Sequence, residues 1–93
     1  MIIGSLQVRI LIPASQSLKS KRMVLKSVIT RIRNKFNVSI AEQNGHDLWQ
    51  SATLGVVITG CERKFLDQAL SKLMDHLRSL TNIEVLDHHL EFL

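Results

Sequence analysis

The stretch from Ser17 to Phe36, SLKSKRMVLKSVITRIRNKF, repeats its apolar residues with the period of an α-helix. At about 100° per residue, six of its large apolar side chains fall in one sector roughly 100° wide. These side chains are Leu18, Leu25, Val28, Ile29, Ile32 and Phe36. A stripe of this width needs a core to pack against, and Ser17 stands before it as the expected N-cap. The sequence therefore predicts one long amphipathic helix that covers another layer of the fold.

A second side of the same helix is basic. By the same rotation, four cations fall within about 60° of one another, namely Lys19, Arg22, Lys26 and Arg33. Lys21 falls near the apolar sector at the helix start, where we expect its stem to lie on the core and its ammonium to reach water. Helix N-termini favour acidic residues because the helix dipole is positive there, yet these first turns carry cations and no acid. The pattern indicates an anion nearby, and the alternative is a basic face that is only solvated.

The charges of the chain are divided unequally between its two parts. Residues 1–41 hold eight Lys or Arg residues and no acid, a net charge of +8. Residues 42–93 hold four basic and eight acidic residues, a net charge of −4, and the two parts give the +4 of the whole chain. Such asymmetry indicates an anionic partner for the first part, or attraction between the two parts within a chain or across a dimer.

The length of 93 residues and the hydrophobic content of 45% predict one globular domain, residues 1–93. A chain of this length can form a hydrophobic core that is stable without disulfides or a bound metal. The single cysteine, Cys61, cannot form a disulfide within the chain and indicates a reducing compartment. The chain has no apolar run near the roughly 20 residues of a membrane span, and its start lacks the basic segment of a signal peptide. We therefore expect a cytoplasmic protein with no membrane partner.

Periodicity divides the chain into alternating strands and helices. Residues that alternate between apolar and polar predict strands, and apolar residues at three- and four-residue spacing predict helices. The predicted strands are 2–12, 38–43, 49–59 and 83–92, and the predicted helices are 17–36 and 62–80. In the last strand the apolar phase shifts near Leu86, which a β-bulge or an edge position would explain.

The order β-α-β-β-α-β predicts an α+β, ferredoxin-like domain. Right-handed crossovers place both helices on one face of a four-stranded antiparallel sheet, with the N-terminal and third strands at its centre. We expect the other sheet face to be polar to mixed in character and to carry no aromatics, with the residues Ser5, Gln7, Arg9, Thr53, Val57 and Thr59.

Several short motifs carry a family resemblance over nearly the whole chain. Residues 17–22 (SLKSKR), 37–42 (NVSIAE) and 47–50 (DLWQ) resemble blocks of the YlxP-like family of small bacterial proteins, and residues 54–56 and 85–87 match more loosely. The resemblance implies a ferredoxin-like fold in a small cytoplasmic protein. It also implies an RNA-related role, because genes of this family often lie beside those for translation initiation and ribosome maturation.

Three residues near the end of the predicted hairpin are candidates for an interface or for recognition: Asp47, Trp49 and Gln50. Trp49 is the only tryptophan, and its ring suits packing or dimerisation better than base stacking. Asp47 is expected to cap the turn. Glu42, the first acid of the chain, is expected to pair with a basic side chain.

The sequence also holds residues that resemble catalytic or metal-binding motifs. Asp87-His88-His89 spells a phosphoesterase motif, but such sites need further ligands, and adjacent residues on a strand point to opposite faces. Cys61 lies at a predicted helix start, where a thiol can become reactive, but no partner is fixed beside it. We predict no catalytic residue, no metal and no cofactor.

The leading hypothesis is a non-enzymatic accessory factor that contacts RNA or the ribosome through phosphates. Its expected binding residues are Lys19, Lys21, Arg22, Lys26 and Arg33. A second hypothesis is a homodimeric interaction or metabolite-binding module that uses the open sheet face or an edge strand. A third is an acylphosphatase-like enzyme, although residues 13–17 lack the glycines of a phosphate-binding loop. Nothing in the sequence points to DNA specifically.

Overall fold

The computed structural model describes residues 1–13, 16–43 and 50–93. The elements are β1 (Ile2–Leu11), α1 (Leu18–Lys35), β2 (Ser39–Glu42), β3 (Ser51–Gly60), α2 (Arg63–Ser79) and β4 (Glu84–Phe92). The predicted βαββαβ order is therefore confirmed. The second strand is shorter than predicted, and the third begins two residues later and ends one residue later than predicted.

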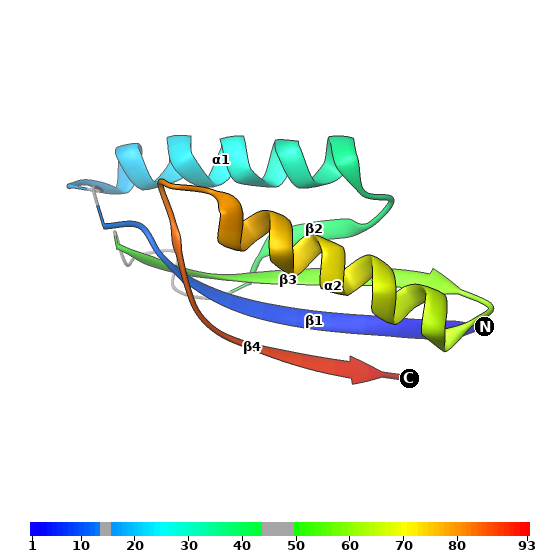
Figure 1. Cartoon of the computed structure of the whole chain (residues 1–93). Helices are drawn as coiled ribbons and strands as arrows, with labels where there is room; N and C mark the ends of the chain where they lie inside the picture. The colour runs from blue at the N-terminus through cyan, green and yellow to red at the C-terminus, as the bar shows by residue number, and fades with distance from the viewer. Residues whose placement is uncertain (14–15, 44–49) are drawn as a thin grey trace.

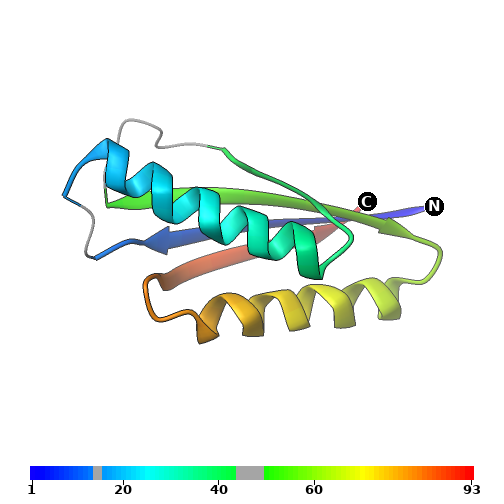
Figure 2. The same ribbon diagram turned by 90° about the horizontal axis from the view of Figure 1, so that it is seen from above.

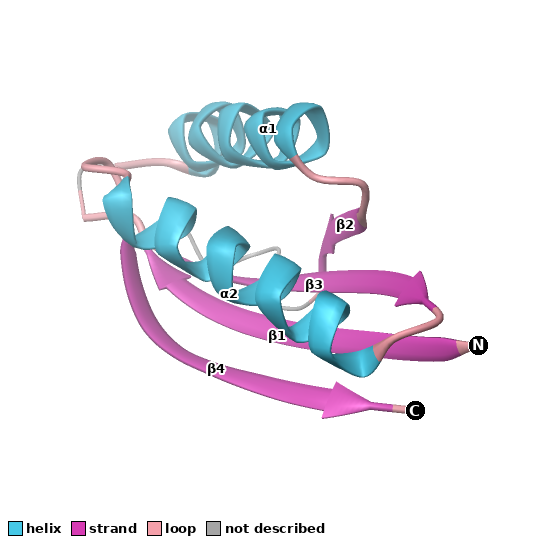
Figure 3. Ribbon diagram, turned by 45° about the vertical axis from the view of Figure 1, so that its right-hand side comes forward, coloured by secondary structure: helices cyan, strands magenta, loops and turns pink. Residues whose placement is uncertain are grey.

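The four strands form one antiparallel sheet with the order β2-β3-β1-β4. As predicted, β1 and β3 are central. Both helices lie on the same side of this sheet and run in opposite directions (Figures 1, 2 and 3). The arrangement is the predicted ferredoxin-like fold, with one covered sheet face and two outer strands, β2 and β4.

The core lies between the helices and the covered face of the sheet. From β1, the side chains of Leu6, Val8 and Ile10 are at most 1% exposed, whereas Gln7 and Arg9 between them are exposed on the other face. The helices contribute apolar residues at helical spacing, namely Leu25, Val28 and Ile32 from α1 and Leu66, Leu70, Leu73 and Leu77 from α2. Each fully buried side chain of this size contributes roughly 1.5–3 kcal/mol, so the alternation of β1 fixes which sheet face the helices cover.

Helix α1 begins at the predicted cap. Ser17 has extended backbone angles, φ −159° and ψ 163°, and its hydroxyl accepts a hydrogen bond from the backbone N–H of Ser20 at 3.1 Å. This bond satisfies one of the backbone donors that a helix start leaves unpaired. The first turn has no acidic residue, so the cap hydroxyl supplies the polar contact that an Asp or Glu would otherwise make.

Strand β4 contains the irregularity expected near Leu86. Its pairing with β1 changes from Arg9 opposite Asp87 to Ile10 opposite Val85, so Leu86 is the additional residue of a bulge. Leu86 is 43% exposed, because the bulge turns its side chain out of the regular alternation.

Neither helix in the part of the chain that the structure describes combines the length and the apolar content that a membrane crossing requires.

The cap at Ser17 leads to a prediction about stability. Replacing Ser17 with Ala should lower the free energy of unfolding by about 1 kcal/mol, because the Ser20 N–H loses its acceptor. Ser27→Ala on the exposed side of the same helix should be neutral or slightly stabilising, since alanine favours helix. Urea unfolding of both variants measures the difference, and equal effects would show that the hydroxyl of Ser17 does not stabilise the helix.

Candidate nucleic-acid interface

Four cations form a strip along one side of α1. Lys19, Arg22, Lys26 and Arg33 are all exposed, and we call these four residues the basic strip. Helix α1 contains no Asp or Glu, and none of the four pairs with a carboxylate of the described residues. Four of the five predicted anion-binding residues therefore lie together and exposed on one side of a single helix.

The prediction for Lys21 was wrong. Its side chain is 1% exposed, and its ammonium lies 3.0 Å from the Oε2 atom of Glu42. The cause is tertiary: the first turn of α1 lies beside the end of β2, so the ammonium meets a carboxylate before it reaches water. A buried ammonium requires such a partner, because desolvation of a lone charge is costly. Lys21 thus belongs to the interior, and the expected pairing of Glu42 with a basic residue is confirmed.

The basic strip borders a groove between α1 and β2 with a volume of about 390 Å³. Arg22, Lys26 and Arg33 line it from the helix, together with the apolar side chains of Leu25 and Ile29. Leu25 is buried and Ile29 is half-buried, so the groove has an apolar floor below charged side chains. Sequence analysis did not find this groove, because it depends on the distance between α1 and a strand that follows it.

Arg33 connects the basic strip to the edge of the sheet. Its Nη2 donates a hydrogen bond of 3.0 Å to the backbone carbonyl of Ile40 in β2. A guanidinium carries five N–H donors, so this bond orients Arg33 and leaves donors for a ligand. The same bond occupies a carbonyl of the outer strand β2.

The hairpin residues of the interface prediction fall into two groups. Asp47 and Trp49 lie outside the described residues. Gln50 is exposed, and its backbone carbonyl accepts a hydrogen bond of 2.7 Å from the N–H of Ile12. Its backbone therefore extends the pairing of β1 and β3, and the role of its side chain in recognition stays a prediction.

The other sequence motifs are dispersed in the structure. Cross-strand register places His88 opposite Val8 and His89 opposite Gln7, so the two histidines start from opposite sheet faces, as expected. Asp87 pairs with Arg9 at 3.3 Å. Across residues 1–13, 16–43 and 50–93, no three His, Cys, Asp or Glu side chains gather in a way that suits a metal ion. Cys61 is exposed and is not joined to another cysteine.

The positive charge of α1 also affects a histidine on the other helix. His76 of α2 contacts Phe36 edge to face, with ring centroids 6.2 Å apart. Burial lowers the pKa of His76 below its ordinary value of 6.5, and the charges of Lys35 and Arg31 lower it further. The folded chain therefore favours the neutral ring.

Comparisons with known proteins agree with the fold and the motifs. The family described as "Protein of unknown function (DUF503)" matches residues 3–90. The "Uncharacterized protein YlxP" of Bacillus subtilis (strain 168) is 36% identical over 83 residues, which cover 89% of this chain and 90% of that protein. The resemblance drawn from the motifs is thereby confirmed. The solved structure of the "De novo designed protein Foldit4" is similar with a TM-score of 0.50 over 99% of this chain and 94% of that chain, but at 9% identity it shows the fold alone.

The Lys21–Glu42 pair predicts that removing one partner lowers stability strongly and that removing both restores most of it. Glu42→Gln should lower the free energy of unfolding by about 3 kcal/mol, because it removes the carboxylate that lies 3.0 Å from a buried ammonium. The double variant Lys21→Met with Glu42→Gln should recover most of that loss, since it removes the buried ammonium together with its carboxylate. Lys19→Met on the same turn is the control and should change stability by less than about 0.5 kcal/mol. A double variant as unstable as Glu42→Gln alone would contradict this account.

The lowered pKa of His76 predicts a pH dependence of stability. Between this lowered value and the ordinary value of 6.5, the unfolded chain binds more protons than the folded chain, so stability decreases as pH falls through that interval. The Tm of the parent should therefore fall more on acidification than the Tm of His76→Gln.

In the variant Arg31→Gln with Lys35→Gln, NMR titration should give a higher pKa for His76, and an unchanged value would contradict the stated influence of these two cations.

Proposed function

The chain belongs to the family described as Protein of unknown function (DUF503), and for this member we propose a non-enzymatic accessory role in which the basic strip of α1 binds the phosphates of RNA, free or in ribosomal particles. The observation that carries this proposal is the exposure of Lys19, Arg22, Lys26 and Arg33 on one side of a helix without a single acid. Clustered cations on one face are the electrostatic footprint of a polyanion-binding protein.

The spacing of the basic strip supports a linear polyanion rather than a single small anion. At 1.5 Å per residue, Arg22 and Lys26 are separated by about 6 Å along the helix axis, and Lys26 and Arg33 by about 10 Å. From Lys19 to Arg33 the strip extends about 21 Å. A small anion can touch only one or two of these residues, whereas a nucleic-acid backbone can contact all four.

The electrostatics of the remaining chain support the same assignment. Attraction between the basic and acidic parts of the chain is an alternative explanation of the charge asymmetry. Two cations of the first part do pair with acids of the second part: Arg9 pairs with Asp87, and Lys21 pairs with Glu42. The basic strip is not part of these pairs, so its positive charge remains available to an external partner.

The open sheet face favours phosphate contact over base stacking. RNA-recognition sheets present aromatic rings on their central strands, and the open face of β1 and β3 here carries Gln7, Arg9, Thr53 and Val57. These side chains offer no ring for stacking. We therefore assign recognition to charge along α1, with little dependence on base sequence.

The proposal predicts salt-dependent binding to single-stranded RNA. Four phosphate contacts at about 0.7 each give a slope near −3 for log K against log salt concentration. Arg22→Glu with Lys26→Glu should remove most of the affinity, which fluorescence anisotropy of a labelled RNA oligonucleotide measures. Both side chains are exposed, so the cost in stability should stay within about 0.5 kcal/mol for each.

A charge-matched control separates a local site from net charge. Lys64→Glu with Lys72→Glu makes the same change in net charge on the exposed face of α2 and should retain most of the affinity. Co-sedimentation of parent and variants with ribosomal particles across a salt series then tests the particle-bound form. If the α1 variant stays folded and binds as well as the parent, the basic strip is only a solvated face.

A further inference from the structure

Strand β4 presents a long unpaired edge. Reciprocal hydrogen bonds join Ile3 and Leu93, at 3.0 Å and 2.8 Å, and they fix which backbone groups of β4 point toward β1. Because this direction alternates along an antiparallel pair, the N–H and C=O groups of His88, Leu90 and Phe92 point away from β1, along the outer edge. The described residues place no further strand beside β4.

The two edges of the sheet differ in their protection. Strand β2 has four residues, and Arg33 already occupies the carbonyl of Ile40. Strand β4 has nine residues, and its bulge at Leu86 leaves the segment from Asp87 to Phe92 regular. A long regular edge is a template for pairing with another chain, so β4 is the edge more open to a partner strand.

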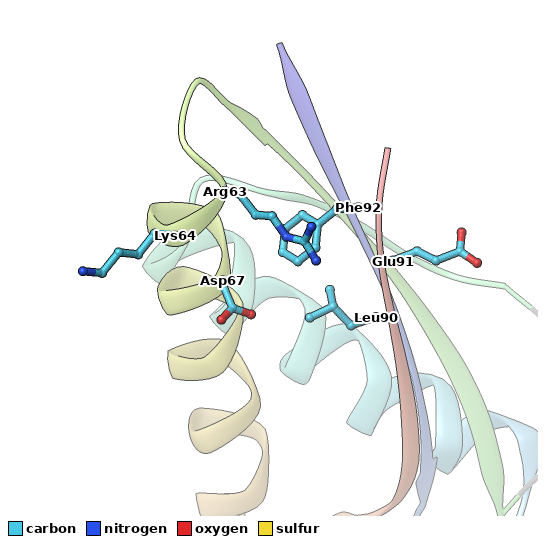
Figure 4. Close-up of a pocket in the computed structure, with 6 residues that line it drawn as sticks. All are labelled: Arg63, Lys64, Asp67, Leu90, Glu91 and Phe92. Carbon is cyan, nitrogen blue, oxygen red and sulfur yellow. The ribbon is translucent and has the colours of Figure 1, made fainter.

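A groove beside this edge offers additional surface to a partner strand. It lies between the start of α2 and β4 and has a volume of about 650 Å³. Leu90 and Phe92 point toward the helix side, and Glu91 points away from it (Figure 4). The guanidinium carbon of Arg63 lies 4.6 Å from the centroid of the Phe92 ring. A strand added to β4 would extend along this groove and cover the half-buried Leu90 and Phe92.

We propose that the partner strand is β4 of a second copy, paired antiparallel about a twofold axis at Leu90. In this register His89 lies opposite Glu91 of the second copy, twice by symmetry, and Asp87 lies opposite Leu93. A pair of an imidazole and a carboxylate across strands is favourable because the two groups can share a hydrogen bond, and like charges directly opposite are unfavourable. An axis at His89 instead places Asp87 opposite Glu91, and an axis at His88 forces the pairing across both bulges. The chemistry of β4 is thus self-complementary in the Leu90 register.

Cysteine cross-linking tests this register. All variants carry Cys61→Ser, because Cys61 is exposed. A mixture of His89→Cys and Glu91→Cys chains should form a disulfide-linked pair under mild oxidation, since directly opposite residues lie within disulfide range. Each variant alone should stay unlinked, because its two cysteines are diagonal, about 7–8 Å apart. Efficient linking of His89→Cys with itself, or none in the mixture, would overturn the proposed register.

Backbone substitution tests the edge itself. His88→Pro removes an N–H that points outward and leaves the pairing with β1 in place, so the chain should stay folded but become monomeric. His88→Ala is the matched control and should remain dimeric. Light scattering at high micromolar concentration measures the mass, and circular dichroism confirms the fold. A monomer mass for the parent, or a dimeric and folded His88→Pro, would overturn the proposal whether or not the basic strip binds RNA.

Discussion

The whole structure depends on β1 being paired on both of its edges. It contacts β3 on one side and β4 on the other, and Leu6, Val8 and Ile10 point from it into the core. A slip of one residue would turn these side chains toward the open face and bring Gln7 and Arg9 under the helices. The cost of burying an arginine without a partner makes this alternative register unfavourable. The alternation of one strand therefore decides which sheet face the helices cover and which strands become edges.

This arrangement separates two kinds of surface. Helix α1 and the short strand β2 form a positively charged side, where Arg33 joins the helix to the strand edge. Helix α2 and β4 form the opposite side of the domain, with a longer edge and mixed charges. A polyanion on α1 and a second copy on β4 would not compete for the same residues.

Much of this fold was predictable because it depends on short-range patterns. The alternation of residues 2–12, the cap at Ser17 and the phase shift at Leu86 each report local geometry, and each is confirmed. Lys21 was predicted wrongly because helical rotation gives only its direction, near the apolar sector. Whether that direction leads to water depends on Glu42, which lies in another strand. Both grooves escaped prediction for the same reason, since each is formed by elements whose separation the sequence pattern does not give.

Because Lys21 is buried, the packing of α1 on β2 can be followed by chemical labelling of its amine. Lys19 and Lys26 hold their amines in water, whereas Lys21 is 1% exposed between them. An amine-reactive reagent will modify the outer two lysines in the native state and reach Lys21 only when the first turn of α1 separates from β2. The rate of labelling at Lys21 therefore reports the free energy of the opening that exposes it, and a rate above that of global unfolding indicates local opening. One buried residue thus reports how firmly the helix that carries the basic strip is attached to the sheet.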